Sequence, residues 1–445
     1  MEEQIQALLE RVHADGVEFV NLQFSDIFGT LKSATIPVGR LRDSLLQGTW
    51  FDGSSIQGFA RICESDMLLR PDPATYSLVP WRPRQPAEAR LICDIYRPDG
   101  QPFEGDPRYI LKRALARARE MGWIYNVGPE LEFFLLEREG NHVALSPHDP
   151  AGYFDLGPRD RALDVRREIT RALETMGLEV EMAHHEGAPG QHEIDIRYSE
   201  ALSAADQALT VRYAVKSVAH QCGLHATFMP KPFFGVNGSG MHTHQSLFDL
   251  EGRNVFFSPD DPYYLSPLAR HFIAGQLFHA RAMCAVLSPT VNSYKRLTPG
   301  YEAPVYICWG QINRSALIRV PSYSPGREQS VRVELRCPDP SCNPYLAFAV
   351  MLHAGLDGIE RGLEPPEPVE ENVYGFDDVR LAERSIGVLP GSLGEALKEM
   401  ERSPLMRKAL GEHAFSYYLL AKAKEWDAFR IAVTDWEVQR YLEIL

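Results

Sequence analysis

The chain has few of the features that mark secreted, membrane or zinc-binding proteins. Its seven cysteines are scattered, odd in number and never spaced as CxxC, which argues against a disulfide framework and a zinc knuckle. No apolar run approaches the roughly 18 residues that span a bilayer. The start, MEEQIQALLERV, has the pattern of an acidic amphipathic helix rather than of a signal peptide. We therefore expect a cytoplasmic protein with no membrane partner.

Positive charge is also scarce. The 46 lysines and arginines are outnumbered by 60 aspartates and glutamates, which gives a formal net charge of −14. Binding to a phosphate backbone needs clustered Lys and Arg, so this balance disfavours a nucleic-acid partner. A Walker A loop is lacking as well, because GxxxxGK[ST] occurs nowhere in the chain. If the ligand is anionic, the positive charges that bind it must be concentrated locally.

The length and the remaining composition predict an ordinary globular protein of more than one domain. The 445 residues are 44% hydrophobic and 24% charged. The first hundred residues predict a short helix followed by strands, one of them LICDIY. Asp106 as N-cap and Pro107 at the first helical position then signal a new helix. We expect a small domain over residues 1–105 and a second domain over residues 106–445.

Helical and strand-like patterns are mixed in the second domain, which predicts an α+β fold. Helices are expected at about 160–176, 200–222, 265–287 and 344–361. Strands are expected around 127–136, 179–185, 192–197, 241–248, 305–320 and 330–336. A Pro/Glu-rich link, GLEPPEPVEENVYGF, precedes a last run of helices.

The stretch VGPELEFFL places two carboxylates within an apolar, aromatic run. In a strand, Glu130 and Glu132 project to one face while Leu131 and Phe133 take the other. A solvated outer face is one explanation. If the face is enclosed, two unpaired carboxylates are costly unless a cation lies beside them or one of them is protonated.

Three further segments repeat this construction and favour an enclosed site. MAHHEGAPGQHEIDI carries Glu186 and Glu193 around a Gly/Pro turn, SVRVELRCP carries Glu334, and NGSGMHTHQSLF carries His242. Glutamates with one histidine suit a hard cation such as Mg²⁺ or Mn²⁺ better than zinc. The number of carboxylates indicates two or three ions in one site.

Cationic residues gather in segments rich in turns and strands rather than on helices. They are Lys231, Lys295, Arg296, Arg314, Arg319, Arg327, Arg332 and Arg336. Arg forks together with Mg²⁺ clamp phosphoryl groups and carboxylates, whereas any single one of these residues could equally form a surface ion pair. The Gly-rich segment KPFFGVNGSGMH allows close approach of backbone to a nucleotide. TPGYEAPVY predicts either a mobile loop that presents Glu302 or a plain surface loop.

These segments, in this order, resemble glutamine synthetases of the bacterial type I family. The match runs through FDGSS, ESDM, GPELEFF, HHEGAPGQHE, KPFFGVNGSGMH, SYKRLTPGYEAP, NRSALIRVP and RVELRCPDPSCNPYL. The resemblance implies ligation of ammonia to glutamate with ATP, through γ-glutamyl phosphate. It also implies a β-grasp-like N-terminal domain that contributes to the neighbouring subunit's active site, and a catalytic domain with a curved antiparallel sheet flanked by helices. The expected assembly is a dodecamer of two stacked hexameric rings.

The resemblance also implies a role for each matching residue. One metal ion would be held by Glu132, Glu186 and Glu193, and a second by Glu130, His242 and Glu334. Glutamate would contact Asn237, Gly238 and Arg296, and its phosphoryl group would contact Arg314 and Arg336. The nucleotide side would carry Lys231, His244, Ser246, Arg319 and Arg332. Asp52 would bind ammonium and remove its proton, and Glu302 would be the flap acid that accepts a proton from the tetrahedral adduct.

Regulation and alternative functions rest on fewer residues. Arg61 in GFARICESDM resembles the branch of the family that glutamine inhibits directly, and we expect no adenylylation of Tyr374. A regulatory protein of nitrogen metabolism remains a possible partner. The alternatives are a γ-glutamyl ligase for a polyamine or ethanolamine, a silent nitrogen-sensing member, and a generic two-metal phosphotransferase. Asp52, Ser54 and Glu302 favour ammonia, because a larger amine needs a more open pocket.

Overall fold

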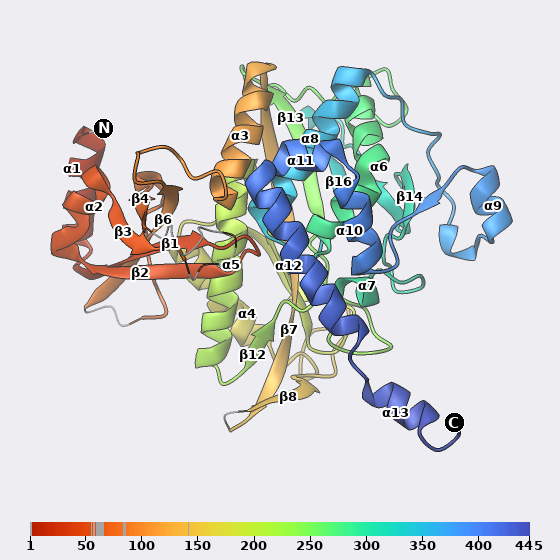
Figure 1. Ribbon diagram of the computed structural model, residues 1–445, viewed down its shortest axis with the longest axis horizontal. Helices are drawn as coiled ribbons and strands as arrows, with labels where there is room; N and C mark the ends of the chain where they lie inside the picture. The colour runs from red at the N-terminus through yellow and green to blue at the C-terminus, as the bar shows by residue number, and fades with distance from the viewer. Residues whose placement is uncertain (1, 55, 57, 59–65, 83–85, 141) are drawn as a thin grey trace.

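The computed structural model describes residues 2–54, 56, 58, 66–82, 86–140 and 142–445 (Figure 1). Its first part is a six-stranded sheet in the order β2-β1-β6-β4-β3, with β5 paired to β6. These strands are β1 (Val17–Ser25), β2 (Leu31–Pro37), β3 (Thr49–Asp52), β4 (Asp66–Pro71), β5 (Ser77–Leu78) and β6 (Ala87–Tyr96). Helices α1 (Glu2–Ala14) and α2 (Leu41–Gln47) accompany them. β1 pairs in parallel with β6 and antiparallel with β2, as in a β-grasp domain.

The second part is built on an eleven-stranded sheet in the order β17-β14-β15-β16-β13-β7-β10-β9. Its strands are β7 (Trp123–Glu139), β8 (His142–Pro147), β9 (Val180–His185), β10 (Gln191–Ile196), β11 (Ser199–Glu200), β12 (His225–Thr227), β13 (Thr243–Asp249), β14 (Tyr306–Gly310), β15 (Ala316–Arg319), β16 (Val333–Leu335) and β17 (Gly387–Val388). All pairings are antiparallel except β14 with β15. β7 is 17 residues long and pairs with five other strands, so it positions much of the sheet.

Helices pack against this sheet and against each other. They are α3 (Pro107–Glu120), α4 (Leu163–Thr175), α5 (Ala201–Gln221), α6 (Pro267–Leu287), α7 (Ser293–Arg296), α8 (Pro344–Arg361), α9 (Asp378–Glu383), α10 (Leu393–Glu401), α11 (Pro404–Leu410), α12 (Glu412–Arg430) and α13 (Asp435–Tyr441). α6 and α8 touch through Gly275 and Gly358, where a Cβ on Gly275 would lie 2.1 Å from the Ala354 oxygen. Only glycine permits this approach. Within the described residues, no helix has the length and apolarity needed to cross a membrane.

The predicted mixed α+β fold is confirmed, and the predicted helices agree with α4, α5, α6 and α8 to within three residues at each end. One strand expectation was wrong, because residues 305–320 form two parallel strands, β14 and β15, rather than one. The intervening loop is stabilised by polar groups. Asn313 Oδ1 accepts from the Ser315 amide at 2.8 Å, and the Glu370 carboxylate accepts from the amides of Gln311 and Ile312. Such local hydrogen bonds compete with a continuous strand.

A buried ion network joins the two parts of the chain. Arg108, at the start of α3, is 3% exposed and donates to Asp206 of α5 at 2.9 Å. The same guanidinium donates to Asp94 of β6 at 2.7 Å and to Asp72 at 2.8 Å. Burial alone would lower the pKa of Arg108, but the carboxylate of Asp206 raises it above its ordinary value. The charge is therefore retained, and it fixes the N-terminal sheet relative to the second part of the chain.

We expect Arg108→Ala to destabilise the protein by about 3 kcal/mol or more, because it removes the charged partner of the buried Asp206 carboxylate. The matched control is Arg97→Ala, since Arg97 pairs with Glu104 at 3.0 Å with 43% of its side chain exposed. An exposed pair of that kind contributes at most about 1 kcal/mol. The measurement is the urea midpoint of unfolding of both variants. Equal shifts in the two midpoints would contradict this role for Arg108.

Candidate active site

Cross-strand register brings the predicted carboxylates together on one face of the sheet. In the antiparallel pair of β10 with β7, Glu193 lies opposite Glu132 and Asp195 lies opposite Glu130. Like charges directly opposite each other destabilise a sheet. Glu132 and Glu193 are each only 7% exposed, so water screens them poorly. The solvated-face explanation is therefore excluded for these two residues.

The pKa values of this face show the cost of the arrangement. Burial, followed by the nearby Glu186 carboxylate, raises the pKa of Glu132 to about 8. Burial and the Glu132 carboxylate also raise the pKa of Glu193 far above its ordinary value. Without a cation these side chains hold protons at neutral pH. A divalent ion beside Glu132, Glu186 and Glu193 would favour their ionised forms and offset their mutual repulsion.

Among the described residues, Glu130, His242 and Glu334 of the second predicted set form a group of possible metal ligands, whereas Glu132, Glu186 and Glu193 of the first set do not form such a group. One ligand atom from each of Glu130, His242 and Glu334 lies within 4.8 Å of the others. His242 Nδ1 is 3.4 Å from Glu130 Oε2 and 4.0 Å from Glu132 Oε1, so the two sets adjoin each other. Carboxylate oxygens with one imidazole nitrogen fit Mg²⁺ or Mn²⁺. These residues come from β7, β16 and the segment just before β13.

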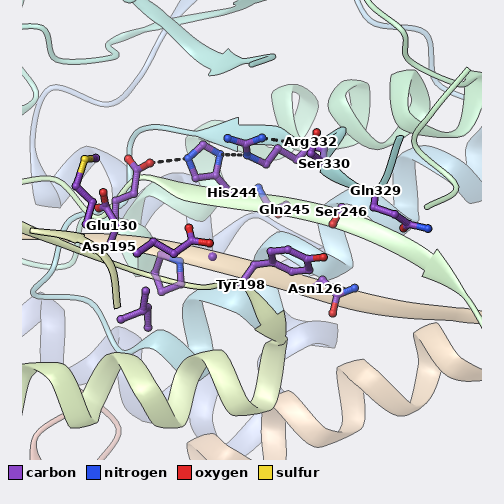
Figure 2. Close-up of a pocket in the computed structure, with 15 residues that line it drawn as sticks. Asn126, Glu130, Asp195, Tyr198, His244, Gln245, Ser246, Gln329, Ser330 and Arg332 are labelled. Atoms are coloured by element: carbon purple, nitrogen blue, oxygen red, sulfur yellow. Dashed lines mark hydrogen bonds and ion pairs between the residues drawn. The ribbon is translucent and has the colours of Figure 1, made fainter. Parts of the chain in front are cut away.

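A cavity of about 390 Å³ opens beside the second set, and Figure 2 shows the side chains that line it. Of the residues predicted on the nucleotide side, His244, Ser246 and Arg332 line this cavity. We call the face of the sheet on which Glu130, Glu132 and Glu193 lie the carboxylate face. Glu130 also lines the cavity, so the cavity borders this face. The remaining labelled residues are Asn126, Asp195, Tyr198, Gln245, Gln329 and Ser330.

A chain of hydrogen bonds links this cavity to the carboxylate face (Figure 2). Arg332 Nε donates to His244 Nδ1 at 3.1 Å, and His244 Nε2 lies 2.6 Å from Glu130 Oε1. Because Nδ1 accepts from a guanidinium, the proton of a neutral His244 must sit on Nε2 and be donated to Glu130. Burial acts to raise the pKa of Glu130, but His244 and His242 lower it well below its ordinary value. Glu130 is thus held as an anion.

Lys231 and Arg319, also predicted on the nucleotide side, are not among the residues that line this cavity. Arg319 Nε donates to Glu334 Oε2 at 2.6 Å, and Arg336 Nε donates to Glu334 Oε1 at 3.2 Å. Both oxygens of Glu334 are therefore oriented by arginines. Lys231 directs its ammonium to the Val236 carbonyl and the Tyr301 ring.

The residues predicted to contact glutamate lie around the Gly-rich segment. Arg296 is 5% exposed and donates to the carbonyls of Cys337 at 2.9 Å and Arg336 at 3.0 Å. Gly238 packs against it, since a Cβ there would lie 3.1 Å from Arg296 Cγ and 2.4 Å from the Pro230 oxygen. Glycine is therefore required for this close contact. The Asn237 amide lies beside Gly187, next to Glu186.

The predicted flap acid lies in the segment between α7 and β14. Glu302 has φ of 55°, in the left-handed region, and its side chain is 59% exposed. Arg314 Nη1 lies 4.0 Å from Glu302 Oε1. Two aromatic residues lie near the carboxylates of Glu186 and Glu193. The centre of the Phe154 ring lies 4.3 Å from that of the His184 ring, on which it stacks. Glu186 and Glu193 add to burial in raising the pKa of Tyr153. Sequence reasoning missed these aromatics, although AGYFDLG sets them in a small, polar loop.

Asp52 is set apart from this cluster. It ends β3 in the N-terminal sheet, and its Oδ1 accepts from the Ser54 amide at 2.8 Å. The hydroxyl and amide of Ser54 lower the pKa of Asp52, which keeps it an anion. Among the described residues, no contact joins Asp52 to the carboxylate face of the same chain. Arg61, the predicted regulatory residue, lies outside the described residues.

Two family models match the chain. "Glutamine synthetase, beta-Grasp domain" matches residues 16–98, and "Glutamine synthetase, catalytic domain" matches residues 104–441. A glutamine synthetase of Methanosarcina mazei is 53% identical over 439 residues, covering 98% of this chain and 97% of the relative. One of Thermus thermophilus is 52% identical over 441 residues, covering 98% of both. A solved structure, "GmaS/ADP complex-Conformation 1", has a TM-score of 0.89 at 33% identity and covers 98% of this chain and 99% of that chain.

We expect Glu130→Gln to weaken binding of Mn²⁺ by about tenfold or more. Loss of a residue that only contacts a metal ligand already lowers metal affinity by about tenfold, and Glu130 is a predicted ligand itself. The matched control is Glu137→Gln, an exposed carboxylate on the same strand. Isothermal titration of each purified protein with Mn²⁺ measures the effect. Wild-type affinity in Glu130→Gln would show that this carboxylate is not a ligand.

Proposed function

The chain belongs to the glutamine synthetase family, and we propose that it ligates ammonia to the γ-carboxylate of glutamate, with ATP converted to ADP and phosphate. One observation carries the proposal. Glu130 belongs both to the second metal set and to the wall of the cavity that His244, Ser246 and Arg332 line. A nucleotide in that cavity would direct its terminal phosphate at the carboxylate face.

The first step joins glutamate to phosphate. A carboxylate is a poor electrophile, so its γ-oxygen attacks the terminal phosphorus of ATP, ADP leaves, and γ-glutamyl phosphate forms. Bound Mg²⁺ or Mn²⁺, in two or three ions, would offset the negative charge that gathers on the transferred group. Ligand atoms of His184, Glu193 and Asp195 also lie within 4.8 Å of one another, and Glu193 is shared with the first predicted set. Arg336, 6% exposed and fixed by Glu334, would stabilise the equatorial oxygens together with Arg314.

The second step joins the acyl group to ammonia. Ammonium must lose a proton before nitrogen can attack, and Asp52 is suited to accept it because Ser54 keeps this carboxylate ionised. Nitrogen then attacks the acyl carbon, and Glu302 takes a proton from the tetrahedral adduct as phosphate leaves. An acyl phosphate also reacts with water, so the flap that carries Glu302 must exclude it.

We further propose that the active site is completed by a second subunit in a dodecamer of two stacked hexameric rings. Asp52 lies in the N-terminal sheet, which Figure 1 shows beside the second domain, residues 106–445. α13 projects from the rest of the chain (Figure 1). Apolar side chains are exposed on α13 and on the residues that flank it, between 431 and 445. They are Ile431, Val433, Trp436, Val438, Tyr441, Leu442, Ile444 and Leu445. Burial against another subunit would remove this surface from water. A cytoplasmic location and a nitrogen-regulatory partner are part of the same proposal.

A larger amine is not favoured as the acceptor. The relatives at about half identity over nearly the whole chain carry the name glutamine synthetase. The chain also retains Asp52, Ser54 and Glu302, which suit a small cation. We also expect Tyr374 to remain unmodified, because its hydroxyl donates to the Ala303 carbonyl at 2.7 Å.

The test is phosphate release from ATP with Mg²⁺ and glutamate, comparing ammonium with ethanolamine and putrescine. We expect turnover with ammonium and a fall of about a hundredfold or more in Asp52→Ala, because the general base is lost. Asp43→Ala, an exposed carboxylate of the same domain, is the control. A preference for either larger amine would show that this amine, rather than ammonia, is the substrate. No turnover with any amine would contradict the proposed catalysis.

A further inference from the structure

The flap, residues 298–305, connects α7 to β14 and includes a main-chain hydrogen bond from the Val305 amide to the Ala303 carbonyl at 3.0 Å. Glu302 adopts φ of 55°, a region that side chains with a Cβ rarely occupy. The ion pair of Glu302 with Arg314 is long, 4.0 Å, and both side chains are more than half exposed. A strained residue persists only where its surroundings hold it. Contacts made by the residues on either side of Glu302 therefore contribute to holding it.

On one side, Tyr301 is held by the ammonium of Lys231. Lys231 Nζ lies 4.0 Å from the centre of the Tyr301 ring and also donates to the Val236 carbonyl. Lys231 is 8% exposed, and no carboxylate is paired with it among the described residues. Its main chain is fixed by Asn292, which accepts from the Lys231 amide at 2.7 Å and donates to the Lys231 carbonyl at 3.0 Å. A poorly solvated cation of this kind is attracted to the face of an aromatic ring.

On the other side, Ala303 is held by Tyr374. The Tyr374 hydroxyl donates to the Ala303 carbonyl at 2.7 Å, and the Tyr374 ring packs 6.0 Å from that of Tyr306. Burial raises the pKa of Tyr374 to about 12, so the hydroxyl keeps its proton at neutral pH. The turn that carries Tyr374 is in turn bound to the loop of Arg314, because the Val373 amide donates to Ser315 Oγ at 3.1 Å.

We propose that the Lys231–Tyr301 contact and the Tyr374–Ala303 hydrogen bond together form a clamp that positions Glu302 over the acyl phosphate. Lys231 and Tyr374 are positioning residues, since they act on Glu302 through the two residues that flank it. Through Val236, Lys231 also links the flap to the segment that carries Asn237 and Gly238. The clamp therefore couples flap position to the glutamate site, and this inference rests on the proposed function.

The clamp decides which nucleophile reaches the acyl carbon. When ammonia attacks, a C–N bond forms, the C–O bond to phosphate breaks, and Glu302 takes the excess proton, so each phosphate is matched by one glutamine. When water attacks, the same C–O bond breaks but glutamate is regenerated, so phosphate is released without glutamine. A loosened flap admits water, and it raises the ratio of phosphate to glutamine.

The experiment measures phosphate and glutamine in the same reaction of the full-length protein with ATP, Mg²⁺, glutamate and ammonium. We expect Tyr301→Leu to raise the ratio about threefold or more, because the ring is lost. The matched control is Tyr301→Phe, which keeps the ring and should keep the ratio near that of the wild type. Tyr374→Phe, which loses only the hydroxyl, should raise the ratio about twofold, because one neutral hydrogen bond is removed.

The ratio separates positioning from general damage, since a merely destabilised enzyme makes both products more slowly in the same proportion. An unchanged ratio in both Tyr301→Leu and Tyr374→Phe would overturn the clamp, as would equal increases in Tyr301→Phe and Tyr301→Leu. If Tyr301→Leu does not fold, the near-isosteric Tyr374→Phe decides alone. Failure of the wild type to form glutamine would instead overturn the proposed function.

Discussion

Repulsion among buried carboxylates is the interaction on which the rest of this structure depends. Antiparallel pairing of β7 with β10 places Glu132 opposite Glu193, and the turn before β10 brings Glu186 to the same place. Burial and mutual repulsion raise the pKa values of Glu132 and Glu193, so ionising both carboxylates together is costly. The fold tolerates this cost because divalent cations relieve it, and the same cations are the ones that phosphoryl transfer requires.

Hydrogen bonds from the surrounding polar groups fix the orientation of the neighbouring carboxylates Glu130 and Glu334 in addition to offsetting their charge. Both oxygens of Glu334 accept from arginines, and His244 receives a hydrogen bond from Arg332 while it donates to Glu130. The cavity lined by His244, Ser246 and Arg332 and the carboxylate face are therefore joined by hydrogen bonds. Preorganised charge of this kind contributes to catalysis because the site need not reorganise during the reaction.

Sequence alone predicted what depends on local periodicity. The long helices α6 and α8 were predicted closely, and the alternation of β7 correctly placed Glu130 and Glu132 on one face. The same alternation places Asn126 on that face, a signal that was available and not used. What sequence could not supply was contact between distant segments. The position of Lys231 under Tyr301 depends on how the Gly-rich segment packs against the flap, which no local pattern encodes.

The central claim is that this carboxylate face and its cavity transfer phosphate to the γ-carboxylate of glutamate. The most direct test uses glutamate labelled with ¹⁸O in the γ-carboxylate, together with ATP, Mg²⁺ and ammonium, and determines the mass of the phosphate released. If γ-glutamyl phosphate forms, the bridging oxygen leaves with phosphorus, and the phosphate carries one ¹⁸O atom from the labelled carboxylate. Phosphate free of ¹⁸O would contradict the account, because its oxygen would then have come from water.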